Sequence, residues 1–370
     1  MTNKIGISIE KSILFNALAN VQSAVDNKST IALLNNVKLD VEGGKLTITA
    51  TDMDIMVSEA ISCESDVEGS LTVGARALFD VVRKMPEDSI SIRGDSDTGK
   101  CQIKSKGFRF SLPCLSSNEF PIIERGDLDC EVDINSIEFL KLLNKTKFAM
   151  SNDEVKYNLN GINLRINESN NLVSYATNGH KLARLISESN DLDFPSITIH
   201  SKAIGIILKA LDKINGNLKI SVSTSKICIL CDNFIIISKL IDGAFPDVER
   251  VFPADSGELL NINRESLLRA TDRVSLASDN KSRSVTFNVA ENLFNISARS
   301  DGNGYAEEDI EIQTDIQNLK LGFNSKYLIE VLTNLDCEFV NIEFYRDRKL
   351  IIITNPNNQS ETYIIMGMSV

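Results

Sequence analysis

The stretch SYATNGHKLAR, residues 174–184, places a histidine next to a lysine just after a short β-like run. An imidazole beside an ammonium group could move protons, so His180 and Lys181 are candidates for acid–base chemistry. The chain has only two histidines, and the second, His200, lies at the predicted start of a helix. This scarcity argues against a histidine-dependent triad or a multi-histidine metal site.

Two other groups of residues have types that could bind metal or undergo redox chemistry. Cys228 and Cys231 form a CxxC, but their run is apolar and strand-like and has no histidine nearby, so we interpret both as buried small hydrophobic residues. Asp52 and Asp54, in TDMDIM, could suggest a Mg²⁺ site, but the aligned segments TNGHKL and RSDGNG do not preserve that chemistry. Phosphate-binding glycine motifs are absent. We therefore expect a non-enzyme with no catalytic residue, no metal and no cofactor.

The composition is that of a soluble globular protein with several cores. The chain has 370 residues and a mass of 40.9 kDa, with 42% hydrophobic and 24% charged residues, which predicts two or three domains. No apolar run is long enough for a membrane span, and the start MTNKIGISIEKS lacks the features of a signal peptide. Seven scattered cysteines fit a reducing compartment. We expect a cytoplasmic protein with no membrane partner.

Two sets of three segments align without gaps, and each segment predicts a short strand followed by an amphipathic helix. The first set comprises residues 7–27, 132–152 and 260–280, and the second comprises residues 71–85, 197–211 and 321–335. Short β-like runs follow each predicted helix, so the sequence reads as three copies of a unit that is βαβββ twice over. The predicted fold class is α+β, with three repeated sheet-plus-two-helix domains.

The charge is distributed unevenly along the chain. The net charge of −12 alone argues against nucleic acid as a partner, but the six predicted helices carry a net positive charge and the remainder is more acidic still. If all helices face one way, one side of the molecule is positive, which suits phosphate contact that ignores base sequence. The alternative is that these lysines merely solvate exposed helix faces.

Several motifs resemble one family. SYATNGHKLAR (174–184) resembles the ATDGHRLA stretch of the bacterial sliding clamps, the beta subunits of DNA polymerase III. GAFPDVERVFP (243–253) resembles that family's GxFPDYxRVxP segment, and YIIMGMSV (363–370) its YVVMPMR-type tail. KYNLNGI, FNSKYLIEVL and TDMDIMV also fit, so the resemblance covers the whole chain in order.

The resemblance implies a head-to-tail homodimer of three-domain (DNA clamp) subunits, closed into a six-domain ring around duplex DNA, with domains at 1–127, 128–253 and 254–370. Such a processivity factor holds DNA by topology, reads no base and tethers the replicative polymerase. The implied partners are duplex DNA, the replicative DNA polymerase alpha subunit, the clamp loader complex, and other DNA polymerases, ligase and repair proteins with clamp-binding motifs.

The resemblance also implies an apolar client cleft between the second and third domains, with the 177–182 turn as one wall and His180 as a contact residue rather than a catalyst. Methionine and aliphatic side chains suit a surface that accepts varied short linear motifs. The cleft residues would be Leu159, Thr177, Gly179, His180, Lys181, Leu182, Pro246, Arg250, Val251, Asn324, Tyr327, Ile364, Ile365, Met366, Gly367 and Met368.

The chain departs from the family pattern at several positions. Gly367 stands where the family usually has proline, which predicts a more flexible tail that binds clients less tightly. Lys181 and Ser369 each replace a usual arginine, which removes bidentate options at the rim.

Further residues are expected at the hole and at the dimer seam. Phe110 and Leu276 match the family's apolar dimer positions, where a sheet continued between subunits would hide an edge strand. The residues expected near DNA phosphates are Lys28, Arg76, Lys156, Lys202 and Lys209.

Two rival functions stay open at this point. One is a DNA-independent peptide-binding scaffold, which would be a monomer whose retention on DNA does not depend on DNA topology. The other is an enzyme that uses His180 and Lys181 as acid and base.

Overall fold

The computed structural model of the chain describes residues 2–25, 29–86, 88–126, 128–190, 192–212 and 214–368. Each of its α-helices lies within one of the six aligned segments and directly follows a strand. The βαβββ pattern predicted from the sequence is found twice in each repeat, with one additional strand, β5, in the first. The fold class predicted from the sequence is therefore confirmed.

The elements of the three repeats follow in chain order. The first repeat contains β1 (Lys4–Glu10), α1 (Lys11–Val21), β2 (Asn36–Glu42), β3 (Lys45–Thr51), β4 (Ile55–Ser62), β5 (Glu64–Val67), β6 (Gly69–Gly74), α2 (Ala75–Lys84), β7 (Ser89–Asp95), β8 (Lys100–Ser105) and β9 (Phe108–Ser116). The second contains β10 (Cys130–Asn135), α3 (Ser136–Thr146), β11 (Gly161–Ile166), β12 (Asn171–Thr177), β13 (Lys181–Asn190), β14 (Ile197–His200), α4 (Ser201–Leu211), β15 (Asn217–Val222), β16 (Lys226–Cys231) and β17 (Phe234–Lys239). The third contains β18 (Glu258–Asn263), α5 (Arg264–Ser275), β19 (Ser284–Ala290), β20 (Leu293–Ser300), β21 (Gly304–Glu311), β22 (Leu319–Asn324), α6 (Ser325–Asn334), β23 (Phe339–Tyr345), β24 (Leu350–Asn355) and β25 (Asn358–Met366).

Short 3₁₀ turns complete the description. They are η1 (Gln22–Ala24), η2 (Ala32–Asn35), η3 (Lys147–Ala149), η4 (Glu154–Leu159) and η5 (Val248–Val251). None of the helices in the described part of the chain is long and apolar enough to cross a membrane.

The second and third repeats each divide their strands between two sheets, and the first strand of each βαβββ unit pairs with a strand of the other unit of its repeat. In the second repeat β10 pairs with β15, while β14 pairs with β11. In the third repeat β18 likewise pairs with β23, and β22 pairs with β19. All of these pairs are antiparallel, and each joins two strands that are not neighbours in the sequence.

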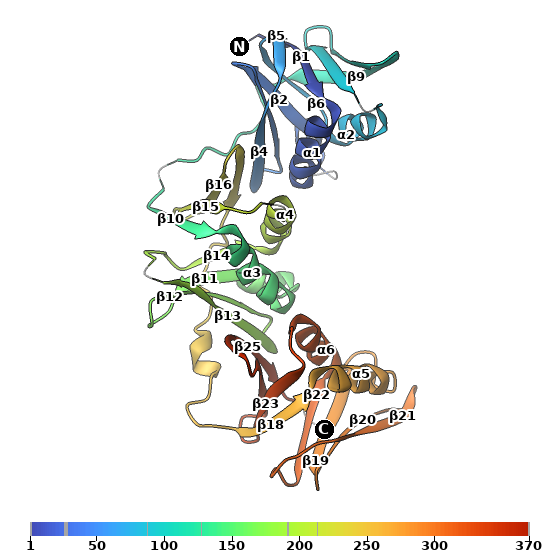
Figure 1. Ribbon diagram of the computed structural model, residues 1–370, viewed down its shortest axis with the longest axis vertical. Coiled ribbons are helices and arrows are strands. Elements are labelled where there is room, and N and C mark those ends of the chain that lie inside the picture. Colours follow the sequence, from blue (N-terminus) through green and yellow to red (C-terminus); the bar gives the residue numbers. More distant parts are fainter. Residues whose placement is uncertain are drawn as a thin grey trace. The chain divides into compact units, whose positions relative to one another are not determined.

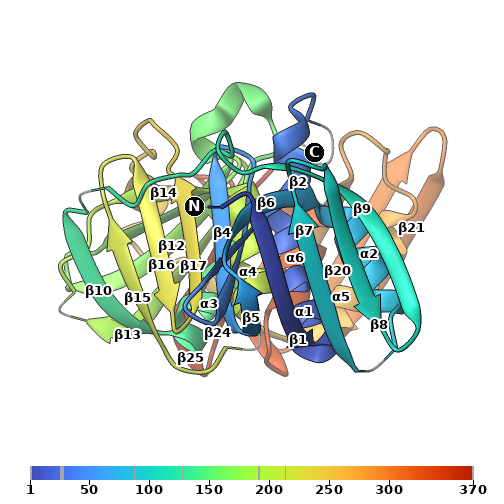
Figure 2. The same cartoon turned by 90° about the horizontal axis from the view of Figure 1, so that it is seen from above.

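The chain forms two compact units, residues 1–140 with 193–195 and 202–240, and residues 141–192 with 196–201 and 241–370. The first unit has one 13-stranded sheet, β10-β15-β16-β17-β4-β3-β2-β6-β9-β8-β7-β1-β5. Figure 2 shows its strands side by side, with β10, β15 and β16 at one end and β1, β7 and β8 at the other. The second unit has an eight-stranded sheet, β14-β11-β12-β13-β25-β24-β23-β18, and a four-stranded sheet, β21-β20-β19-β22.

Two strand pairs join the repeats within these units. β17 of the second repeat pairs with β4 of the first, and β13 of the second pairs with β25 of the third. The second repeat thus gives four strands to the first unit and four to the second. We call these two pairs the first and second joints.

The helices pack in pairs on this framework. α1 lies beside α2 in the first unit and α5 beside α6 in the second (Figure 1). In the second unit the helix starts are capped as sequence rules predict, since the Asn263 and Asn324 side chains accept hydrogen bonds from the main-chain N–H groups of Ser266 and Lys326. One stripe of each helix is buried, for example Leu267, Ala270 and Val274 of α5.

Three aromatic residues form the centre of the four-stranded sheet. Phe287 on β19 is fully buried, and its ring centroid lies 4.8 Å from that of Phe294 and 5.2 Å from that of Phe323. Each ring comes from a different one of three adjacent strands, so the cluster fixes the order of β20, β19 and β22 as well as filling the core.

We predict that Phe287→Ala lowers the free energy of unfolding by about 3–5 kcal/mol, because the cavity it leaves removes contacts with two rings. Urea denaturation followed by circular dichroism measures this change. Phe339→Ala is the matched control, because Phe339 is 42% exposed and should cost less than about 1 kcal/mol. Equal effects of the two substitutions would contradict a core role for Phe287.

Candidate functional site

The turn that contains His180 links β12 to β13 and is built from side-chain hydrogen bonds. The Thr177 hydroxyl donates to the Lys181 carbonyl at 2.7 Å and accepts from the Gly179 N–H at 3.0 Å. Asn178 Oδ1 accepts from the N–H groups of His180 and Lys181 at 2.9 and 3.0 Å. Gly179 has φ +91°, a conformation that favours glycine. The polar residues of this motif therefore hold the backbone of the turn.

The first repeat contains the same turn. The Thr51 hydroxyl donates to the Ile55 carbonyl at 2.9 Å and accepts from the Met53 N–H at 3.0 Å. Asp52 Oδ1 accepts from the N–H groups of Asp54 and Ile55 at 2.9 and 2.8 Å. Asp52 and Asp54 are thus turn residues, and each forms an ion pair with a lysine, Asp52 with Lys202 and Asp54 with Lys239. No group of metal-binding side chains occurs among the described residues.

Lys181 is not available as a partner for His180. Its side chain is 6% exposed, and its Nζ donates to the Phe148 carbonyl at 2.6 Å and to the carboxylate of Glu330. The rings of Phe148 and Tyr327 lie 5.2 and 4.9 Å from the same atom. Burial lowers the pKa of Lys181, and the hydrogen bond to Glu330 opposes that shift. The ammonium group is therefore a structural cation, whereas His180 is exposed.

The two CxxC cysteines lie on β16 as predicted. Both thiols are buried and free, and burial raises the pKa of each, which keeps them protonated and unreactive. Successive strand residues alternate between faces, so Cys228 and Cys231 point to opposite sides of the sheet and cannot share a metal ion.

A groove with a volume of about 250 Å³ lies beside the 177–182 turn, and we call it the client groove. Its floor includes the buried side chains of Leu182, Val248 and Ile364, which belong to one hydrophobic cluster. Leu182 and Ile364 lie opposite each other in the second joint, so the pairing of β13 with β25 assembles the floor. The lining residues are Leu159, Thr177, Gly179, His180, Lys181, Leu182, Pro246, Asp247, Val248, Val251, Ile364 and Met366.

Ten of these lining residues are among those assigned to the cleft from the sequence. Asp247 and Val248 were missed, although both lie inside the motif GAFPDVERVFP that pointed to this segment. Six assigned residues do not line the groove, namely Arg250, Asn324, Tyr327, Ile365, Gly367 and Met368. The first three have other partners, because Arg250 pairs with Asp247, Asn324 caps α6 and the Tyr327 hydroxyl accepts from Asn178.

The remaining three lie on β25 or in the tail that follows it. Ile365 is fully buried and, by strand alternation, points away from the groove between Ile364 and Met366. The Gly367 N–H donates to the Lys349 carbonyl at 2.5 Å, and the Met368 N–H donates to the Gly322 carbonyl at 2.8 Å. A Cβ at residue 367 would lie 2.7 Å from the Lys349 oxygen, so glycine here permits close contact. These contacts anchor residues 367 and 368, while the expected flexibility of the tail and its effect on client binding stay predictions. Ser369 lies outside the described residues.

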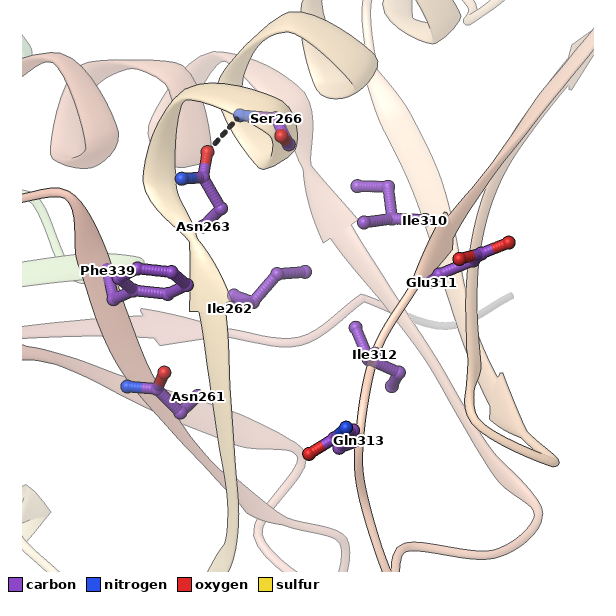
Figure 3. Close-up of a pocket in the computed structure, with 9 residues that line it drawn as sticks. All are labelled: Asn261, Ile262, Asn263, Ser266, Ile310, Glu311, Ile312, Gln313 and Phe339. Carbon is purple, nitrogen blue, oxygen red and sulfur yellow. Dashed lines mark hydrogen bonds between the residues drawn. The ribbon is translucent and has the colours of Figure 1, made fainter.

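A second cavity, of about 580 Å³, lies at an edge of the third repeat, and we call it the edge cavity. Figure 3 shows Ile262 on β18 with Ile310 and Ile312 across the cavity from it. In the first repeat the corresponding strand, β1, is covered by β5, whereas β18 is the last strand of its sheet. Glu311 is the one ionisable side chain in its lining, so the cavity offers no constellation for catalysis.

The basic residues assigned to DNA have different surroundings. Arg76 on α2 and Lys209 on α4 are exposed and make no ion pair within the described part of the chain. Lys202 is engaged by Asp52, and Lys156 Nζ donates to the Asn178 carbonyl at 3.4 Å. Lys28 lies outside the described residues. Sequence reasoning did not single out Lys84 and Lys147, which are also exposed on helical turns.

The two residues assigned to the dimer seam are exposed apolar side chains. Phe110 on β9 is 42% exposed, and its ring is stacked on that of Phe108. Leu276 at the end of α5 is 79% exposed.

Comparison with known families accounts for all three repeats. Residues 5–124, 133–247 and 249–369 match the N-terminal, central and C-terminal domains of the DNA polymerase III beta subunit. The chain belongs to the DNA polymerase III beta subunit family. Its repeats are therefore three clamp domains, and the resemblance inferred from SYATNGHKLAR and the other motifs is confirmed.

Individual proteins of this family are similar to the chain along nearly its full length. The beta sliding clamp of Caulobacter vibrioides is 30% identical over 98% of this chain and 100% of its own, and that of Vibrio cholerae is 30% identical over 97% and 98%. A sliding clamp from Bartonella birtlesii, solved with griselimycin bound, has a TM-score of 0.95 at 30% identity and covers 99% of this chain and 100% of its own.

These relatives confirm the function of a DNA sliding clamp, a non-catalytic processivity factor in DNA replication. They do not favour the peptide-binding scaffold, and the enzyme that would use His180 and Lys181 is excluded. The motif that could be taken for an active site instead forms the turn beside the client groove of this clamp.

We predict that Thr177→Val and Thr51→Val each lower the free energy of unfolding by about 1–3 kcal/mol, because each removes two hydrogen bonds between the threonine hydroxyl and the backbone of the turn. Chemical denaturation of both variants measures the change. The third repeat supplies the control, since Thr286 on β19 lies in regular strand and Thr286→Val should cost less than about 1 kcal/mol. A harmless Thr177→Val would contradict the hydrogen-bonded turn.

Proposed function

We propose that the client groove is where partner proteins dock on this clamp, and that two copies of the chain close into a ring around duplex DNA. The observation that carries the docking proposal is the apolar floor of Leu182, Val248 and Ile364, with Met366 at its side. Such a surface accepts short apolar segments of varied sequence. The clients would be the polymerase alpha subunit, the clamp loader, and other polymerases, ligase and repair proteins with clamp-binding motifs.

Ligands of the relatives give this proposal a chemical probe. Sliding clamps from Bartonella birtlesii and Pseudomonas aeruginosa were solved with griselimycin bound. A Caulobacter crescentus clamp was solved with polyethylene glycol bound to a putative beta-motif tethering region. We infer that this chain also binds griselimycin and does so in the client groove.

We predict that Met366→Ala and His180→Ala each weaken griselimycin binding by about fivefold or more, because each removes a side chain that lines the groove. Isothermal titration calorimetry measures the dissociation constant. Met53→Ala is the matched control, since Met53 is 47% exposed in the equivalent turn of the first repeat. Unchanged affinity in both groove variants would exclude the groove as the binding site.

The ring proposal is supported by the pattern of the two joints. In each joint the last strand of a βαβββ unit pairs with the last strand of a unit in the next repeat: β4 with β17, then β13 with β25. Among the described strands, β21 of the third repeat and β9 of the first are the last strands of their units that have no such partner. β21 is the last strand of its sheet, and residues Phe108–Leu112 of β9 have a strand on one side only. A second copy supplies the missing partner for each, which gives a closed dimer.

The register of the first joint can be transferred to this proposed seam. Ile55 begins β4 opposite Ser238, and Phe234 begins β17 opposite Glu59. β21 begins at Gly304 and β9 begins at Phe108, and we count the register of the seam from these two residues as the register of the joint is counted from Ile55 and Phe234. The transferred register sets Glu307 of one copy opposite Arg109 of the other, and Ala306 opposite Phe110. Opposite charges in directly facing strand residues stabilise such a pair.

We predict that Arg109→Glu and Glu307→Arg each shift the chain from a dimer of about 82 kDa to a 40.9 kDa monomer. Each substitution gives residues 109 and 307, which lie opposite each other at the seam, the same charge, so that they repel. Native mass spectrometry from nanomolar to micromolar concentration measures this shift. The double variant Arg109→Glu with Glu307→Arg restores the opposite charges and should restore the dimer. A double variant that stays monomeric would contradict the register, and a wild-type monomer would contradict the ring.

The proposed contact with DNA is electrostatic and independent of sequence. Arg76, Lys84 and Lys209 are exposed on helices, where they can approach phosphates. Lys147 is also exposed on a helical turn, and its Nζ donates to Asn144 Oδ1 at 2.8 Å. Lys202 would contribute less, because Asp52 neutralises it. Weak, screened contacts of this kind let a ring slide, while its topology prevents dissociation. The tethered polymerase then remains at high effective concentration near the template.

Domain boundaries and location complete the proposal. We assign the clamp domains to 1–127, 128–253 and 254–370, which the three separate family matches support, although the third match starts at residue 249. We propose a cytoplasmic location, because a bacterial clamp works where the chromosome is.

A further inference from the structure

The client groove has two walls of different kinds. One is the strand pair β13 and β25, and the other is the linker that carries Pro246, Asp247, Val248 and Val251. A linker lacks the ladder of hydrogen bonds that fixes a strand. Among the described residues, Glu249 supplies the one side chain in 246–251 that forms a hydrogen bond or ion pair with the sheet.

The Glu249 carboxylate meets groups from three adjacent strands. It accepts a hydrogen bond from the hydroxyl of Tyr175 on β12. Its Oε1 lies 3.7 Å from Arg165 Nη2 on β11, and its Oε2 lies 3.7 Å from Arg184 Nη1 on β13. At 3.7 Å the arginines attract the carboxylate without a direct hydrogen bond, so the tyrosine provides the directional contact.

Both arginines are held in place by the surrounding structure. The Arg165 guanidinium lies 4.4 Å from the centre of the Tyr175 ring, and the Arg184 guanidinium lies 4.1 Å from the centre of the Phe252 ring. Arg184 also donates to the Thr362 hydroxyl on β25 at 3.1 Å. Burial and then the contact with Glu249 raise the pKa of Tyr175 to about 12, so its hydroxyl remains a donor at neutral pH.

We infer that Glu249 is a positioning residue for the client groove, which draws the 246–251 wall onto the sheet without touching the ligand. Glu249 is not part of the groove lining, but Val248 and Val251, which lie before and after it in the sequence, both line the groove. Val248 points into the hydrophobic cluster while Glu249 reaches the Tyr175 hydroxyl at the edge of that cluster. The width of the groove would then depend on a charge located behind its wall. This inference rests on the proposed function of the groove.

The competing explanation is that burial of Val248 alone holds the wall, and that the Glu249 contacts are ordinary surface ion pairs of little value. The two explanations differ in one respect. If Glu249 positions the wall, its loss changes ligand affinity and the environment of Val251 without changing the rest of the fold. If Val248 alone is sufficient, neither quantity changes.

The test compares Glu249→Ala, Glu249→Gln and Glu131→Gln in the full chain. Alanine removes both the hydrogen bond and the charge, whereas glutamine can still accept from Tyr175. Glu131 is the matched control, because its carboxylate also meets two cations and a hydroxyl, Lys219, Arg125 and Ser221, and lies in the other unit. The probe is griselimycin, and valine-methyl NMR spectra of the free protein report the position of the wall.

We expect Glu249→Ala to weaken griselimycin binding roughly tenfold, the scale of one lost charge-assisted hydrogen bond, and Glu249→Gln to recover part of that loss. The methyl signals of Val251 should move in both variants while those of Val289 in the third repeat stay in place. Glu131→Gln should bind as the unaltered chain does.

Several outcomes would overturn the inference. They are unchanged affinity in Glu249→Ala while Met366→Ala is weakened, an equal loss in Glu131→Gln, or fixed Val251 methyl signals. Failure of the unaltered chain to bind griselimycin would instead overturn the proposed use of the groove. The methyl spectra need no ligand, so they test the position of the wall in that case as well.

Discussion

The backbone of a strand at the edge of a sheet has N–H and C=O groups that need partners, and the rest of this structure depends on how those edges are filled. Within the chain two edges are filled by strands of a neighbouring repeat, β4 by β17 and β13 by β25. The second of these pairs sets Leu182 opposite Ile364 and so creates the floor of the client groove. The groove is therefore a consequence of how repeats are joined, and not a feature of one domain.

The same turn has different surroundings in the first and second repeats. Around Thr51 the turn residue Asp52 is a carboxylate that Lys202 neutralises. Around Thr177 the equivalent residue is an amide, Asn178, and the nearby lysine is drawn away to Glu330 and the Phe148 carbonyl. The second turn thus borders the apolar surface around Leu182, and the charge of Lys181 is paired away from that surface. A small change in polar partners separates a purely structural turn from one that frames a binding groove.

Local patterns in the sequence predicted the helices, whereas the residues of the candidate groove were assigned through the family resemblance. The helices follow from apolar periodicity, and the turn beside His180 follows from its Thr, Asn and Gly residues. The division of the second repeat between two sheets could not be predicted, because β10 finds its partner β15 across more than eighty residues and nothing local records that choice. Ile365 could have been removed from the groove by strand alternation. The burial of the Lys181 ammonium depends on Glu330, in another repeat, and has no local signal.

The pairing of strands from different repeats also bears on synthesis. A ribosome releases β13 well before β25, so the edge that will carry the groove floor stays unpaired until β25 has emerged. The first unit reaches completion earlier, once β17 has emerged and can pair with β4. Nascent chains would therefore expose the edge of β13 from its emergence until β25 follows. That exposure makes the second unit the part of the molecule most dependent on protection from aggregation while it is being made.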